Sequence, residues 1–61
     1  QMTGKELLKN ALANGWEIDR IRGSHHIVKK DGKLEVIPVH DNKDIPVGLQ
    51  KKIMKNLELK D

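Results

Sequence analysis

Residues 23–39 read Gly-Ser-His-His-Ile-Val-Lys-Lys-Asp-Gly-Lys-Leu-Glu-Val-Ile-Pro-Val, and this stretch decides the fold. Asp31-Gly32 indicates a two-residue hairpin turn of type I′, in which both central residues need a positive φ. The turn separates two runs that favour β-strands, residues 25–30 and 33–39. Pro38 has no N–H to donate, so the later strand lies at a sheet edge or ends there. The stretch therefore predicts an antiparallel β-hairpin.

A further strand is predicted before this hairpin. Gly23-Ser24 predicts a turn. Residues 16–22 before it are predicted to form a strand that pairs antiparallel with the strand at residues 25–30. Trp16 and Ile18 alternate onto one face of that strand, and Arg20 and Arg22 continue the same face. Ile21 breaks the alternation, so the pattern leaves undecided which face of this strand points into the core.

A helix is predicted at the start of the chain. Thr3-Gly4-Lys5-Glu6 matches the capping box, in which a Thr cap and a Glu three residues later satisfy each other's backbone donors. Asn14-Gly15 ends the helix, with Gly15 in the left-handed conformation. Between them, apolar residues recur at helical spacing and form one face. These residues are Leu7, Leu8, Ala11 and Leu12.

A second helix follows the hairpin and a polar loop at residues 40–45. Pro46 suits the first position of a helix. Leu49, Ile53 and Leu57 then recur at four-residue spacing, with Met54 beside them. The order α-β-β-β-α predicts an α+β fold, a three-stranded antiparallel sheet with both helices on one face and the other face free. This is the layout of a small double-stranded-RNA-binding-like domain, to which we assign residues 2–61.

Composition narrows the possible partners. The 61-residue chain has 12 Lys and Arg against 9 Asp and Glu, with a pI of about 9.4, which favours a polyanionic ligand. It has no Cys, which excludes disulfides and thiolate metal sites and fits a reducing cytoplasm. No apolar run approaches the ~20 residues of a membrane span, and no signal peptide is visible. We expect a cytoplasmic protein without a membrane segment.

The pair His25-His26 is the candidate for chemistry. Imidazole exchanges protons near neutral pH, and in RNA cleavage a base removes the 2′-hydroxyl proton while cations stabilise the charge on phosphorus. Adjacent residues of a strand point to opposite faces, so the two histidines do not readily share a metal ion, and we predict no metal site. By itself a His-His dipeptide is more often a feature of a turn. The cations around this pair are Arg20, Arg22, Lys29, Lys30 and Lys33.

The chain resembles the HicA toxin family over nearly its whole length, and the shared motifs follow one another in the same order. The motifs that carry the resemblance are Lys5-Glu6-Leu7-Leu8, Asn14-Gly15-Trp16, Arg20, Gly23-Ser24-His25-His26, Ile37-Pro38, His40, Asp44-Ile45-Pro46-Val47-Gly48 and Lys52-Ile53. The chain departs from the family's pattern in two places. It lacks the aromatic residue that the family often has near Val28, and its last helix does not end in an Ala-Gly-Leu-like stop.

The resemblance implies an mRNA interferase, a toxin encoded beside a HicB-like antitoxin, that cleaves mRNA without a metal or other cofactor. It implies one catalytic histidine after the Gly-Ser turn, which falls on His25, with His26 as the runner-up. For the RNA-binding residues we predict Arg22, Ser24, Lys29, Lys30 and Lys33. Lys29 and Arg22 would neutralise phosphate, and Ser24 would shape the turn. The antitoxin is expected to cover the face that carries the histidine.

Two other functions fit the same sequence. A non-catalytic module that binds double-stranded RNA would have the same fold order and basic charge. An interaction protein would use its basic face to bind an acidic partner.

Overall fold

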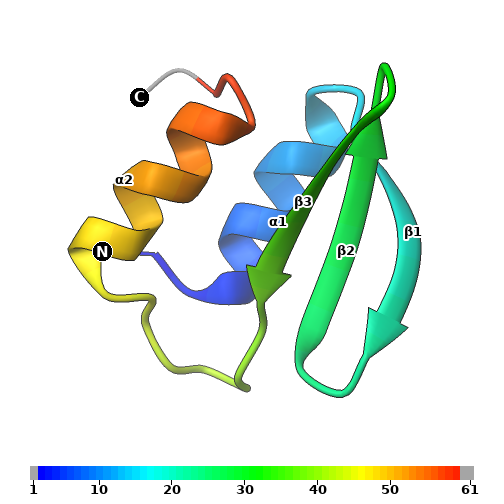
Figure 1. Cartoon of the computed structure of the whole chain (residues 1–61). Helices are drawn as coiled ribbons and strands as arrows, with labels where there is room; N and C mark the ends of the chain where they lie inside the picture. The colour runs from blue at the N-terminus through cyan, green and yellow to red at the C-terminus, as the bar shows by residue number, and fades with distance from the viewer. Residues whose placement is uncertain (1, 60–61) are drawn as a thin grey trace.

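The computed structural model of the chain describes residues 2–59 and shows the predicted order of elements (Figure 1). The helices are α1 (Gly4–Ala13) and α2 (Val47–Asn56). The strands β1 (Glu17–Arg22), β2 (His25–Lys30) and β3 (Lys33–Pro38) form one antiparallel sheet in the order β1-β2-β3. Both helices lie on one face of the sheet, which confirms the α+β prediction. Lys60 and Asp61, assigned to the same domain, lie outside the described residues.

The hairpin that decides the fold has the predicted turn. Asp31 and Gly32 have φ values of 50° and 78°, and both are positive, as a type I′ turn requires. β3 is an edge strand and ends at Pro38. Because no strand lies beyond this edge, the N–H that proline lacks is not needed for pairing. The Val39 N–H then donates to the Ser24 carbonyl over 2.7 Å. This bond fastens the turn before β2 to the end of β3.

A β-bulge in β1 explains why Ile21 breaks the alternation. The pairing with β2 shifts register between Ile18 and Arg20, so Asp19 is the extra residue. Directly paired residues share a face, and Ile18 pairs with buried Val28 on the helix side. After the bulge it is Ile21, not Arg20, that lies on that side. The prediction that Arg20 and Arg22 share a face with Trp16 and Ile18 is therefore wrong.

The core lies between the sheet and the helices and is small. The Trp16 indole Nε1 donates to the Leu57 carbonyl over 3.1 Å, so the one aromatic side chain joins the start of β1 to the end of α2. Leu49 belongs to the apolar repeat of α2, yet 41% of its surface is exposed, and Leu12 of α1 is similarly exposed. The buried apolar side chains of the core are Leu7, Ala11, Trp16, Val28, Ile37, Ile45, Ile53 and Leu57.

The predicted capping box begins α1. The Glu6 N–H donates to the Thr3 hydroxyl, and the Thr3 N–H donates to the Glu6 carboxylate over 2.9 Å. The bond from the Thr3 backbone lowers the pKa of Glu6 below its ordinary value. A carboxyl with a lowered folded-state pKa stabilises the fold at pH values above its ordinary pKa. That stabilisation is lost as the pH falls through the lowered pKa.

The start of α2 is tied to the N-terminal segment. Pro46 is the N-cap rather than the first helical residue, and the helix begins at Val47. The Ile45 N–H donates to the Met2 carbonyl over 2.8 Å, and the Met2 N–H donates to Gln50 Oε1 over 3.1 Å. These bonds bring the loop between β3 and α2 alongside the start of α1.

Trp16→Phe is expected to destabilise the fold by about 2 kcal/mol. The change leaves the buried Leu57 carbonyl without its donor and opens a small cavity, and each effect costs on the order of 1 kcal/mol. Urea unfolding followed by far-UV circular dichroism measures the loss, since the substitution removes the only Trp. Leu34→Ala is a control, because 64% of Leu34 is exposed. An unchanged midpoint for Trp16→Phe would show that this bond contributes nothing.

Candidate functional site

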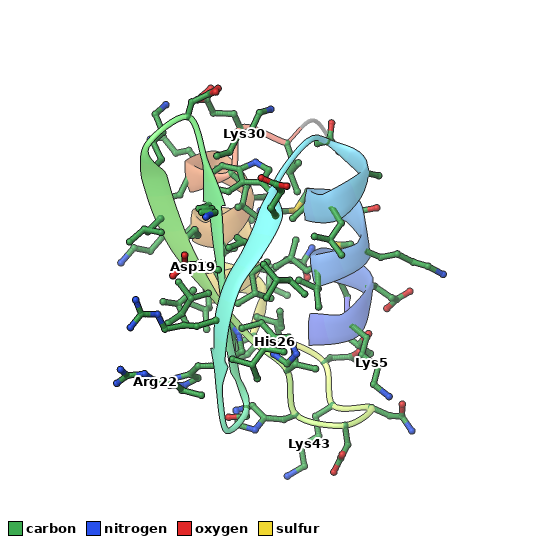
Figure 2. The ribbon with its side chains drawn as sticks, turned by 90° about the vertical axis from the view of Figure 1, so that its right-hand side faces the viewer. Lys5, Asp19, Arg22, His26, Lys30 and Lys43 are labelled. Carbon is green, nitrogen blue, oxygen red and sulfur yellow. The ribbon has the colours of Figure 1, made fainter. Side chains whose placement is uncertain are left out.

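The two adjacent histidines lie on opposite faces of the sheet. His26 pairs with Ile21 and with fully buried Ile37, and paired residues share a face, so His26 lies on the helix side. His25 pairs with Arg22 and Pro38 and lies on the uncovered face. Figure 2 shows Arg22 directed away from the helices and His26 directed toward α1. The predicted divergence of the two histidines is confirmed.

The two imidazoles therefore have different surroundings. His25 is exposed to solvent, whereas His26 is half-buried. His26 Nδ1 is buried and has no hydrogen-bond partner among residues 2–59. A ligand on the uncovered face can reach His25 directly, while the sheet stands between that ligand and His26.

Cations surround His25 on the uncovered face. Arg22 is its direct partner on β1, and Arg20 lies in the next row of the sheet, opposite Ile27. Lys29 is four residues further along β2, which places it about 13 Å from His25 at ~3.3 Å per residue. Asp19, the bulge residue, forms ion pairs with Arg20 at 3.1 Å and with Lys29 at 3.7 Å. Asp19 therefore neutralises part of this cationic face.

Lys30 and Lys33, also predicted to bind RNA, lie apart from His25. They pair with each other at the turn end of the hairpin, on the helix side. Lys30 Nζ donates to the Asn14 carbonyl at 2.7 Å, and Lys33 Nζ lies 2.8 Å from a Glu58 oxygen. That hydrogen bond and charge raise the pKa of Lys33 and lower the pKa of Glu58. Both ammonium groups thus contact the ends of the helices rather than the His25 face.

Ser24, the remaining predicted residue, lies in the turn before His25. Gly23 beside it has a φ of 57°, and the Ser24 carbonyl accepts the bond from Val39. The Ser24 backbone therefore holds the turn that presents His25.

A groove that the sequence did not indicate opens beside His25. It has a volume of about 310 Å³ and lies between β3 and α2. Its polar side chains include Glu35, Lys52 and Asn56. Lys52 and Asn56 lie on α2 and Glu35 lies on β3, so only the packing of α2 against β3 brings the carboxylate to the other two.

Two further observations concern ligands and membranes. Among residues 2–59, no three His, Cys, Asp or Glu side chains gather where they could hold a metal ion. Neither α1 nor α2 is long and apolar enough to cross a membrane.

A known protein family and a known protein match most of this chain. The family described as "HicA toxin of bacterial toxin-antitoxin" matches residues 4–59, which include every helix and strand. A protein of Pseudomonas fluorescens (strain Pf0-1), named "Probable mRNA interferase HicA", is 45% identical over 49 residues. That alignment covers 80% of this chain and 82% of the relative.

Proposed function

The chain belongs to the HicA family of toxins from bacterial toxin–antitoxin systems, and from this we propose that it is an endoribonuclease that cleaves mRNA. The observation that carries the proposal is His25, an exposed imidazole on a cationic sheet face that no helix covers. The name of the relative, a probable mRNA interferase, supports the substrate. An enzyme with this substrate would act in the cytoplasm, with residues 2–61 as one domain.

In the proposed reaction the RNA supplies its own nucleophile. Either His25 accepts the 2′-hydroxyl proton and water protonates the leaving 5′-oxygen, or His25 protonates the 5′-oxygen and water accepts the 2′-hydroxyl proton. The 2′-oxygen bonds to phosphorus as the bond to the 5′-oxygen breaks, which leaves a 2′,3′-cyclic phosphate and a 5′-hydroxyl. Water then opens the cyclic phosphate and completes hydrolysis. No step needs a metal ion. His25 and His26 lie on opposite faces of the sheet, so they cannot bind the same ion.

The cations on the same face have electrostatic roles in this proposal. Arg22, beside His25 in the sheet, stabilises the negative charge that develops on the scissile phosphate. Lys29 binds a phosphate further along the strand, and Ser24 positions the turn. Lys30 and Lys33, which contact the helix ends, contribute mainly to the potential that attracts RNA.

The test of this function compares inducible expression of the wild type and of His25→Ala, together with RNA cleavage by the purified proteins. We expect growth arrest and RNA fragments only with the wild type. Retarded migration of duplex RNA without product after hours would favour the alternative, a non-catalytic double-stranded-RNA-binding module. The order of elements and the uncovered basic face are compatible with that alternative.

The antitoxin partner is proposed to be a HicB-like protein that covers the His25 face. Apolar side chains lie among the cations there, with Leu34 and Val36 exposed and Ile27 half-buried. An acidic partner with an apolar patch would complement both features. Mixing with the co-encoded antitoxin should abolish cleavage. Full activity in a saturated complex would contradict this placement.

Asp19→Asn is expected to strengthen RNA binding about threefold to tenfold at low salt. The change frees Arg20 and Lys29 from their shared carboxylate, and each cation that reaches a phosphate adds affinity that salt screens. Fluorescence anisotropy with a 2′-deoxy-substituted RNA measures the change. Asp41→Asn is the matched control, since it makes the same charge change in the loop before α2. Equal effects of the two variants would point to net charge alone.

A further inference from the structure

We propose that the groove between β3 and α2 binds one unpaired nucleotide next to the scissile bond and favours a base with an exocyclic amino group. The proposal rests on the RNA-cleaving function proposed above and adds a specificity site to it. Three features of the groove support it: its continuity with His25, its apolar walls, and a charged group on each side.

The α2 wall of the groove is a single stripe of the helix. Lys52, Ile53 and Asn56 lie three, four and seven residues after Leu49, which places all four on one face of the helix. Ile53 is buried, so this face packs toward the sheet, while Leu49 is 41% exposed beside it. The stripe therefore combines the apolar side chains of Leu49 and Ile53 with the polar side chains of Lys52 and Asn56.

The opposite wall of the groove is β3, and it leads to His25. Val36 and Pro38 line this wall, and Pro38 is the direct strand partner of His25. His25 itself lines the same groove. A nucleotide whose base enters the groove would thus have its phosphate beside the candidate catalytic imidazole.

The chemistry of the walls fits a base better than another ligand of this size. Leu49 and Val36 offer apolar contact to the flat faces of a base, and single-stranded RNA is read through splayed-out bases. Lys52 offers a positive charge to a flanking phosphate. Within residues 2–59, neither Lys52 nor Glu35 is engaged in an ion pair, so both are available to a ligand.

Glu35 sets the expected base preference. Its Oε1 lies 3.3 Å from the Val36 N–H, a bond that orients the carboxylate and leaves the second oxygen free. An ionised carboxylate only accepts hydrogen bonds, as in the pairing of Glu with the amino group of cytosine. Cytosine, adenine and guanine carry such an amino group, and uracil does not. Uridine should therefore be the poorest occupant of the groove.

The first experiment measures kcat/KM on short RNAs that differ only in the nucleotides next to the cleavage site. The wild type should prefer an amino-bearing base over uracil by at least about fivefold. Glu35→Gln keeps the shape and adds a donor, so it should reduce this preference to about twofold or less while cleavage of the uridine substrate persists. An unchanged preference in Glu35→Gln would overturn the proposal, and changed stability alone would not alter a ratio of substrates.

The second experiment tests the groove without chemistry. An RNA with 2′-deoxyribose at the cleaved position cannot react, so its Kd reports binding alone. Lys52→Ala should weaken binding about fivefold to tenfold at low salt, and Lys51→Ala, outside the groove on the same helix, less than twofold. Equal effects would overturn the proposal. If the wild type cleaves no RNA, the proposed function fails, and this binding comparison still decides whether the groove takes a nucleotide.

Discussion

His25→Ala is expected to lower the rate of RNA cleavage by about 10²-fold to 10⁴-fold, the usual contribution of general acid–base catalysis. His25 is exposed on the sheet face that the helices leave uncovered, so its truncation removes no core packing. The variant should unfold at the same urea concentration as the wild type and should bind RNA within a few-fold of the wild-type Kd. Cleavage of a fluorophore-labelled RNA under single-turnover conditions measures the chemical step.

His26→Ala is the matched control for this experiment because it changes the neighbouring residue on the other face. His26 is half-buried on the helix side, so its truncation removes packing and lowers stability. The folded fraction of this variant should still cleave RNA within a few-fold of the wild-type rate. A folded His26→Ala protein without activity, together with an active His25→Ala protein, would transfer the catalytic role to His26.

Gly4→Ala is expected to destabilise the fold by about 3 kcal/mol or more, the upper end of what overpacking costs. A Cβ atom at Gly4 would overlap the Pro38 carbonyl oxygen and lie 2.8 Å from the Val39 Cα. Both are backbone atoms, so the start of α1 or the end of β3 has to move. Helix propensity alone predicts the opposite sign, since Ala is favoured over Gly by up to about 1 kcal/mol in a helix interior.

Gly48→Ala is the control for Gly4→Ala, because it makes the same substitution in the first turn of α2. A Cβ at Gly48 meets no atom within 4 Å, so propensity and the reduced entropy of the unfolded chain decide the result. We expect a stabilisation of about 0.5 kcal/mol. Thermal unfolding of both variants measures the difference, and a Gly4→Ala protein as stable as Gly48→Ala would contradict the close contact between α1 and β3.

The order of elements followed from local signals in the sequence. Thr3 and Glu6 mark the start of α1, and Asp31-Gly32 marks the hairpin, because a capping box and a type I′ turn depend on neighbouring residues only. Placing His25 and His26 on opposite faces needed nothing beyond the two-residue period of a strand. The motifs around Gly23-Ser24-His25-His26 also identified the family that the comparison shows.

The features that the sequence did not predict depend on contacts between segments that are distant in the chain. The bulge at Asp19 moves Arg20 and Arg22 to the uncovered face, and a bulge arises from the pairing of two strands, which neither strand encodes alone. Leu49 shares the four-residue apolar spacing of Ile53 and Leu57, yet it lies exposed at the groove beside β3 while the other two are buried. Lys30 and Lys33 appeared equivalent to Lys29 in the sequence, but they contact Asn14 and Glu58 near the ends of the helices.

The most direct test of the account is an analysis of the cleaved RNA ends after reaction in excess chelator. A reaction through the 2′-hydroxyl with His25 as acid or base predicts cleavage without a divalent cation. The early products should carry a 2′,3′-cyclic phosphate and a 5′-hydroxyl, and 2′-deoxyribose at the cleaved position should block the reaction. Products with a 3′-hydroxyl and a 5′-phosphate, or cleavage that chelator abolishes, would contradict the account.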